Sequence, residues 1–179
     1  MTHSISWNAR KHPFQHVVSS QALPTDVFQW LLDEIDQFEY TPYTQNKHRY
    51  SARMPDYLLP SLHSLAKSTT TVLTQFNNRG FLNCRWECTL CKDIPPYTIG
   101  PHPDRPNKHL TLLVYLQGST IDGTILHNTP QPFVPNTAIA FVPAANTIHR
   151  VDPIHHNRYT LQMFLKKHSQ GSNINSIVL

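Results

Sequence analysis

The sequence predicts an α+β domain in which two helices precede a run of short strands. Before Gly80, apolar residues recur at helical spacing, whereas after it they fall in short runs separated by Pro, Gly and Asn. Two helices followed by strands are typical of a domain with a β-sandwich or barrel core. With 179 residues and 39% hydrophobic content, the chain can bury one sizeable core and is too short for two ordinary domains.

The amino-terminal part, residues 20–80, is predicted to be mainly helical after a short strand at 12–20. The first helix is expected to open at Pro24, with Thr25 or Asp26 as its cap. A second helix is expected to begin near Pro60 and Ser61 and to end at residues 77–80, Asn-Asn-Arg-Gly. Its apolar positions share one face, as do those of the first helix, which are Val27, Trp30, Leu31, Ile35 and Phe38.

Beyond Gly80, the pattern predicts strands and then a polar tail. The expected strands cover about 82–94, 109–116, 123–128, 137–143 and 158–166. Residues 168–176, rich in Asn, Ser and Gly, are expected to form a mobile tail.

Composition and charge narrow the function classes. No apolar run is long enough to span a bilayer, and the first residues lack the apolar centre of a secretory signal, so a cytoplasmic location is expected. The net charge of +4, with a pI near 9.1, is only mildly basic, and twelve histidines add positive charge below neutrality. This balance allows an anionic substrate, and it gives no reason to expect nucleic acid as a partner.

Three cysteines, Cys84, Cys88 and Cys91, have the C-x3-C-x2-C spacing with which radical-SAM enzymes hold a [4Fe–4S] cluster. Those enzymes need a partial or full α/β barrel, and its strand-helix repeats are absent from this sequence. The local pattern is instead typical of a strand in which Cys84 and Cys88 share a face with Trp86, while Cys91 faces the other way. We therefore interpret the cysteines as small, semi-buried thiols in a reduced compartment.

A possible metal site is encoded by His102, Asp104 and His149, with Arg158 nine residues after the last histidine. An imidazole and a carboxylate two residues apart lie on the same side of an extended strand, and a histidine from a later strand can complete one face of an octahedron. Two histidines and one carboxylate are the ligand set of non-haem Fe(II) oxygenases. The arginine can bind a carboxylate in bidentate fashion, which suggests a dicarboxylate cosubstrate.

These residues belong to two longer matches to a known family. Residues 97–117, YTIGPHPDRPNKHLTLLVYLQ, and 137–165, TAIAFVPAANTIHRVDPIHHNRYTLQMFL, resemble the core of the Fe(II)/2-oxoglutarate-dependent oxygenases, in the branch related to prolyl hydroxylases. The resemblance implies that 1–179 is a single domain whose core, about 82–167, is a double-stranded β-helix of the jelly-roll or cupin-like type. The helices of 20–80 would pack as buttresses on the outside of one sheet.

The resemblance also implies the cofactors and the residues that bind them. Fe(II) would be bound by His102, Asp104 and His149. Arg158 would bind the distal carboxylate of 2-oxoglutarate, and Tyr115 would add a hydroxyl contact. O2 would be the second cosubstrate, with ascorbate as a stimulating reductant. Gln162 and Thr160 share the strand face of Arg158 and are further candidate contacts to the cosubstrate.

The substrate contacts are predicted from the residues, except that the closing of a loop over the iron is what the family resemblance implies. Residues 40–57 concentrate tyrosines and cations around Lys47, Arg49 and Arg53 with one acid, Asp56, and are interpreted as a loop that closes over the iron and contacts an anionic group. A solvated basic loop is the alternative. Tyr97 is placed either at the cavity entrance or at a sheet edge. His127 and Asn128, on the predicted strand 123–128, either face the substrate or pack within the strand.

Three functions are compatible with these observations. The first is a hydroxylase of a small molecule or biosynthetic intermediate, which releases succinate and CO2. The presence of Asp104 favours hydroxylation or oxidative demethylation over halogenation, because the related halogenases lack that carboxylate. The second is a protein hydroxylase of the prolyl type, and a nucleic-acid demethylase is a weaker variant. The third is a non-catalytic, metal-binding jelly-roll protein.

Overall fold

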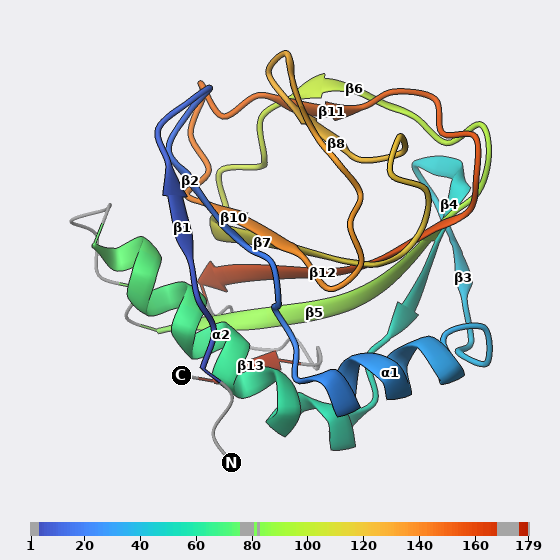
Figure 1. Ribbon diagram of the computed structural model, residues 1–179, viewed down its shortest axis with the longest axis horizontal. Helices are drawn as coiled ribbons and strands as arrows, with labels where there is room; N and C mark the ends of the chain where they lie inside the picture. Colours follow the sequence, from blue (N-terminus) through green and yellow to red (C-terminus); the bar gives the residue numbers. More distant parts are fainter. Residues whose placement is uncertain (1–3, 76–80, 82, 168–175, 179) are drawn as a thin grey trace.

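The computed structural model describes residues 4–75, 81, 83–167 and 176–178, and within them two antiparallel sheets face one another with two helices below (Figure 1). The larger sheet has the order β1-β2-β10-β7-β12-β5-β4-β3, with β13 also paired to β5, and the smaller has the order β6-β11-β8-β9. The bounds of the large-sheet strands, in that order, are Asn8–Arg10, His16–Ser19, Ala138–Phe141, Lys108–Gln117, Arg158–Lys167, Cys84–Asp93, Asn46–Arg53 and Thr41–Tyr43, with β13 at Ser176–Val178. Those of the small sheet are Ile99–His102, His149–Val151, Thr124–Leu126 and Thr129–Gln131.

Helices α1 (Thr25–Glu34) and α2 (Leu59–Thr74) lie where the apolar spacing predicts them, with a short 3-10 turn, η1, at Asp56–Leu58. The predicted side-chain cap on α1 is wrong. Pro24 occupies the cap position without a side-chain hydrogen bond, and Thr25 is already helical. Pro24 suits this place because its fixed φ leads into a helix, and Asp26 in the first turn complements the helix dipole.

Alternation along the long central strands divides the large sheet into an apolar face and a mixed face that also carries polar and charged residues. On β12, Tyr159, Leu161, Met163 and Leu165 belong to the main core cluster, which also contains the buried residues of α1 and α2. Figure 1 shows the helices on that side of the sheet and the small sheet on the other. Between the two sheets, the opposite face of β12 presents Arg158, Thr160 and Gln162.

The cysteine pattern follows the same alternation along β5. Trp86, Cys88 and Leu90 lie in the main core cluster, and Cys84 packs against its edge. Cys91 faces the other way, and none of the three cysteines forms a disulfide bond. This agrees with the strand predicted there.

Residues 40–57 are not a loop, which corrects the sequence prediction. They form the β3–β4 hairpin and η1, and β4 pairs with β5 in a register that sets Arg49 opposite Asp93 and Arg53 opposite Thr89. The sequence of β4, NKHRYSAR, has no alternating apolar pattern that would predict a strand. Ala52 is its one buried residue. The strand forms through backbone pairing with β5 on one side and β3 on the other rather than through an apolar pattern.

Other boundaries also differ from the sequence prediction. Strand β8 ends at Leu126, and His127 and Asn128 form a tight turn into β9, with His127 at φ 50°. The predicted end of the second helix, 77–80, lies outside the described residues. So does the predicted tail, except Ser176, which begins β13. Within the described part of the chain, no helix combines the length and apolar character needed to cross a membrane.

The packing of α2 on the sheet can be tested at Leu62, whose side chain is fully buried in the main cluster. Leu62→Ala should lower the free energy of unfolding by about 2–5 kcal/mol, because it removes buried methyl groups and leaves a cavity. Urea denaturation measures this loss. His63→Ala, at the exposed neighbouring position, is the control and should change stability by less than about 0.5 kcal/mol. Similar losses in both variants would contradict the packing.

Candidate active site

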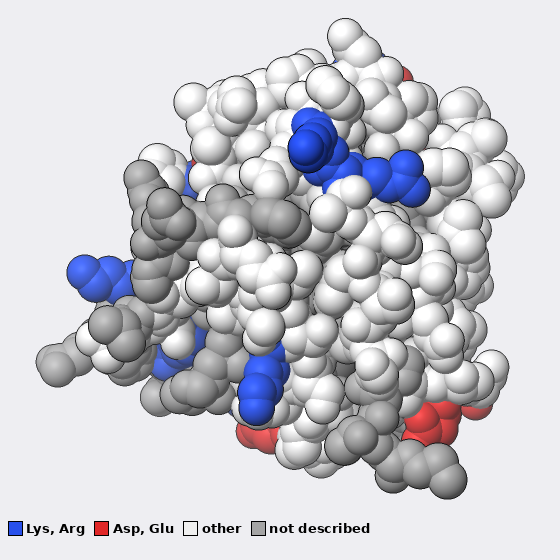
Figure 2. Space-filling view, turned by 60° about the vertical axis from the view of Figure 1, so that its left-hand side comes forward, with Lys and Arg blue, Asp and Glu red and all other residues white. Residues whose placement is uncertain are grey.

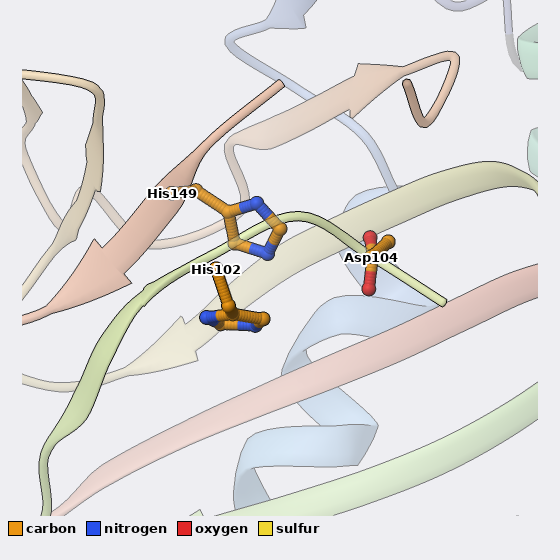
Figure 3. A group of neighbouring side chains, drawn as sticks. All are labelled: His102, Asp104 and His149. Carbon is orange, nitrogen blue, oxygen red and sulfur yellow. The ribbon is translucent and has the colours of Figure 1, made fainter. Parts of the chain in front are cut away.

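The small sheet brings the predicted metal ligands together. His149 on β11 is the direct cross-strand partner of His102 on β6, and their rings lie 4.5 Å apart between centroids. Asp104 follows two residues after His102, beyond the end of β6. One ligand atom from each of the three residues lies within 4.8 Å of the others. Figure 3 shows the two imidazoles side by side, with the carboxylate of Asp104 beyond the His149 ring.

Backbone contacts fix the tautomer of both histidines. Nδ1 of His102 lies 2.8 Å from the carbonyl oxygen of Gly100, and Nδ1 of His149 lies 3.1 Å from that of Thr147. A carbonyl oxygen can only accept a hydrogen bond, so Nδ1 must carry the proton in each ring. Each Nε2 therefore keeps a free lone pair. This is the arrangement that metal-binding histidines require.

Asp104 is held in its ionised form by neighbours on β7. Thr111 Oγ1 donates a hydrogen bond to Oδ2 at 2.6 Å, and the Lys108 ammonium forms an ion pair with Oδ1. Burial by itself raises the pKa of Asp104, but the charge of Lys108 and these hydrogen bonds outweigh it and hold the pKa below its ordinary value. Burial lowers the pKa of His149. Carboxylate and neutral imidazole, the forms that bind a divalent cation, are thus both favoured near neutral pH.

The three residues open onto a cavity of about 460 Å³ between the two sheets. The predicted residues Arg158, Gln162, Tyr97 and Arg49 line the same cavity. Its wall also contains apolar side chains, among them Ile99, Leu113, Phe141, Val151 and Phe164. The wall thus combines apolar side chains with convergent polar and charged groups, as a small-molecule site requires.

Arg158 is almost fully buried, with 1% of its side chain exposed. Its Nη1 donates to the backbone oxygen of Asp122 at 2.9 Å. Its Nε lies 3.1 Å from Asp93 Oδ2 in an ion pair but makes no hydrogen bond. The hydroxyls of Thr124 and Thr160 are likewise buried without a partner. Buried polar groups are nearly always satisfied, so three orphaned atoms among residues in and beside the cavity fit a polar ligand that is bound there.

Tyr115 does not line the cavity itself, but its hydroxyl lies beside Thr124, a residue of the cavity wall. Its ring stacks on Phe133 with 4.3 Å between centroids, and its hydroxyl oxygen accepts a hydrogen bond from the backbone N–H of Thr124 at 2.9 Å. The phenol proton is therefore still available to donate. Burial raises the pKa of Tyr115, so the proton stays in place at neutral pH. Thr160 is its cross-strand partner on β12.

The fold places the predicted substrate-binding residues in different parts of the structure. Tyr97 is buried under the Arg49 guanidinium, at 4.5 Å from its ring centroid, in the cavity wall. Arg53 points to a different hollow beside Trp30 and pairs with Asp56, and Lys47 is exposed. His127 and Asn128 lie in the β8–β9 turn, where Arg150 Nη1 donates to the backbone oxygen of His127 at 2.6 Å. Neither of these two residues lines the cavity.

Four residues that position the site were not predicted from the sequence: Asp93, Lys108, Thr111 and Asp122. Asp93 had a detectable signal, because alternation along the predicted strand 82–94 puts this acid on the face opposite Trp86 and Leu90. Lys108 and Thr111 lie close to Asp104 in the chain, but they are three positions apart, so regular strand parity would put them on opposite faces. An irregularity in the pairing of β7 with β12, between Leu110 and Lys108, separates them. Asp122 acts on Arg158 through its backbone oxygen, and no side-chain pattern reveals such a contact.

We compared the sequence and the structure with those of known proteins. No family model and no curated protein matches the sequence. Among solved structures, a Pseudomonas putida prolyl-4-hydroxylase has a TM-score of 0.62 at 18% identity, over 93% of this chain and 95% of that one. A Trichoplax adhaerens prolyl hydroxylase in complex with a hypoxia inducible factor peptide has a TM-score of 0.64 at 16% identity, over 85% and 83%.

A third match is SnoN, a non-haem, α-ketoglutarate-dependent epimerase from nogalamycin biosynthesis. It has a TM-score of 0.57 at 10% identity, over 88% of this chain and 82% of that one. The chain has the fold of these oxygenases. The family resemblance inferred from the sequence is therefore confirmed at the level of the fold, and the jelly-roll-like architecture with it.

The supporting role of Thr111 can be measured through metal affinity. Thr111→Val keeps the shape of the side chain but removes the hydrogen bond to Asp104, so Co(II) should bind about 10-fold more weakly. Asp104→Ala should lose stoichiometric binding. Isothermal titration under anaerobic conditions gives both affinities. Thr129→Val, the same substitution at an exposed strand position, should bind Co(II) as the parent does; if Thr111→Val does so as well, Thr111 does not orient the ligand.

Proposed function

We propose that the protein is an Fe(II)- and 2-oxoglutarate-dependent dioxygenase that hydroxylates a small molecule or biosynthetic intermediate. The observation that carries the proposal is the joint presence, in one cavity, of a two-histidine, one-carboxylate group and a buried arginine with an orphaned donor. Residues 1–179 would form one domain, with a double-stranded β-helix core at about 82–167 and α1 and α2 as its buttresses.

Each site residue has a role that follows from its contacts. His102 and His149 would bind the metal through Nε2, and Asp104 through a carboxylate oxygen, while Thr111 keeps that carboxylate oriented. Arg158 would bind the distal carboxylate of the oxoacid, with the Tyr115 hydroxyl as a second donor and Thr160 and Gln162 close by. When bound, Fe(II), 2-oxoglutarate and O2 would supply the oxidising power, with succinate and CO2 as products, and ascorbate would keep the metal reduced.

The cavity favours a small, anionic substrate over a macromolecule. Five cations line it, namely Arg49, Arg105, Lys108, Arg158 and Lys166, whereas Asp104 is the one acid among its described lining residues. The face in Figure 2 shows a few Lys and Arg side chains among uncharged residues, with acidic side chains near its lower edge. On that face the described cations do not form the continuous stripe with which proteins bind nucleic acid. Tyr97, in the cavity wall, would contact the substrate.

The decisive experiment is anaerobic reconstitution with Fe(II) followed by 2-oxoglutarate. A metal-to-ligand charge-transfer band should appear, and admission of O2 with a metabolite pool should release succinate in excess of a substrate-free control. Absence of the band at saturating 2-oxoglutarate would rule out the proposal. A band without succinate, for metabolites and peptides alike, would favour a non-catalytic metal-binding protein.

A protein hydroxylase of the prolyl type is the second candidate, because the matching structures include prolyl hydroxylases. Proline-containing peptides in the same succinate assay separate it from the first candidate. Peptide-dependent succinate, with none from metabolites, would select it.

The cosubstrate contacts make unequal contributions to affinity. Arg158→Ala should weaken 2-oxoglutarate by on the order of 2–5 kcal/mol, because it removes the charged partner of a buried carboxylate. Tyr115→Phe should weaken it by about 0.5–1.5 kcal/mol, since one hydroxyl contact is lost. Anaerobic titration of the charge-transfer band measures both. An Arg158→Ala variant with the parent's affinity would place the carboxylate elsewhere.

A further inference from the structure

Three charged side chains face one another across three neighbouring strands at one end of the cavity. Asp93 on β5 is the direct cross-strand partner of Arg49 on β4 and of Arg158 on β12. Directly opposite residues in an antiparallel sheet point to the same face, and adjacent strands lie about 4.8 Å apart. The Asp93 carboxylate is completely buried, so both guanidiniums must satisfy it from within the protein.

The two arginines share the same carboxylate unequally. Arg49 binds it in bidentate fashion, with Nε 2.6 Å from Oδ1 and Nη2 2.9 Å from Oδ2. Arg158 Nε approaches Oδ2 at 3.1 Å without a hydrogen bond. Two guanidiniums thus meet at one oxygen atom, and a single negative charge faces two positive charges. The group of Arg49, Asp93 and Arg158 therefore carries one net positive charge, next to a donor that lacks an acceptor.

Arg49 lies on β4, and its side chain reaches the cavity. Its side chain is 13% exposed, lines the cavity and lies over the ring of Tyr97. Among the described residues, Asp93 is its hydrogen-bond acceptor, through Nε and Nη2, so the N–H groups of Nη1 remain for a ligand. Burial by itself lowers the pKa of Arg49, but the hydrogen bonds and charge of Asp93 raise it above its ordinary value. The positive charge is therefore permanent.

We propose that Arg49 and Arg158 act together around Asp93 as a two-guanidinium site for the distal carboxylate of the oxoacid. This inference rests on the proposed function and adds a specificity-determining residue from strand β4, outside the strands that carry the metal ligands and Arg158. One net positive charge matches one carboxylate, so the site selects a dicarboxylate oxoacid over a monocarboxylate of equal length. The ligand carboxylate also relieves the repulsion between the two guanidiniums, which Asp93 alone leaves partly uncompensated.

The test compares Arg49→Gln with Arg53→Gln, a matched control on the same strand whose arginine is exposed and pairs with Asp56. The ligands are 2-oxoglutarate and 2-oxopentanoate, which has a methyl group in place of the distal carboxylate. Anaerobic calorimetry on the Mn(II)-loaded protein gives the dissociation constants. Arg49→Gln should raise the Kd of 2-oxoglutarate about 10-fold or more and change that of 2-oxopentanoate by less than about 2-fold. Arg53→Gln should match the parent with both ligands.

A second measurement needs no metal and no turnover. Glutarate, which lacks the keto group, should raise the Tm of the metal-free parent and of Arg53→Gln, but raise it less in Arg49→Gln. If Arg49→Gln does not fold, Arg49→Lys replaces it. A lysine keeps the charge but loses the planar fork, so the Kd of 2-oxoglutarate should still rise several-fold.

The outcomes separate this inference from the proposed function. A parent protein that does not bind 2-oxoglutarate defeats the proposed function. A parent that binds it, with Arg49→Gln or Arg49→Lys of equal affinity, overturns the role of Arg49 alone. Equal weakening of 2-oxoglutarate and 2-oxopentanoate would also overturn it, because a merely structural defect does not distinguish the two ligands.

Discussion

The alternation of side chains along β5, β7 and β12 is the constraint on which the rest of the structure depends. Successive residues of a strand point to opposite faces, so the two sets of side chains on each of these strands must suit two different environments. One face buries Trp86, Leu112, Leu161 and their neighbours against the helices, and this contact accounts for most of the apolar core. The opposite face is then free to carry polar and charged residues into the space between the sheets. A shift of register by one residue would exchange the two faces and destroy both core and site.

Charged groups on that inner face are stable because each carboxylate has a cation beside it. At one end of the cavity, Asp93 lies between Arg49 and Arg158. At the other end, Asp104 pairs with Lys108, and Glu87 with Lys166. Isolated charges would be expensive to bury, and paired charges in a partly dry cavity interact more strongly than they do in water. The inner face therefore presents paired charges at both ends of the cavity.

The small sheet places two imidazoles from distant parts of the chain next to each other. Pairing of β6 with β11 sets His102 opposite His149, and backbone oxygens fix the proton of each ring on Nδ1. Thr111, which holds Asp104, comes from the large sheet. The group of His102, Asp104 and His149 thus depends on both sheets, and a ligand in the cavity would contact both. For this reason the candidate ligand residues could be predicted from the sequence, whereas the residues that support them could be identified only from the tertiary structure.

The sequence by itself determined the elements and residues whose signal is local. Helical spacing located α1 and α2, and strand alternation located β5, β7 and β12. The spacing of His102, Asp104, His149 and Arg158 identified residues that the structure places around one cavity. The helix and strand signals, and the spacing of His102 and Asp104, lie within one element or a short motif, where the period of the backbone governs which residues share a face. The resemblance of residues 97–117 and 137–165 to one family joined His149 and Arg158 to that motif.

Only the tertiary structure decided which distant residues meet. Arg49 and Asp93 are 44 residues apart, and β4 has no apolar pattern, so neither their pairing nor the strand itself could be read in advance. His127 and Asn128 follow the alternation of β8 but fall in a turn, because β8 ends where its pairing with β11 ends. The physical reason is the same in both cases. Register between strands depends on hydrogen bonds and packing between segments far apart in the chain, and these contacts exist only once the sheets have formed.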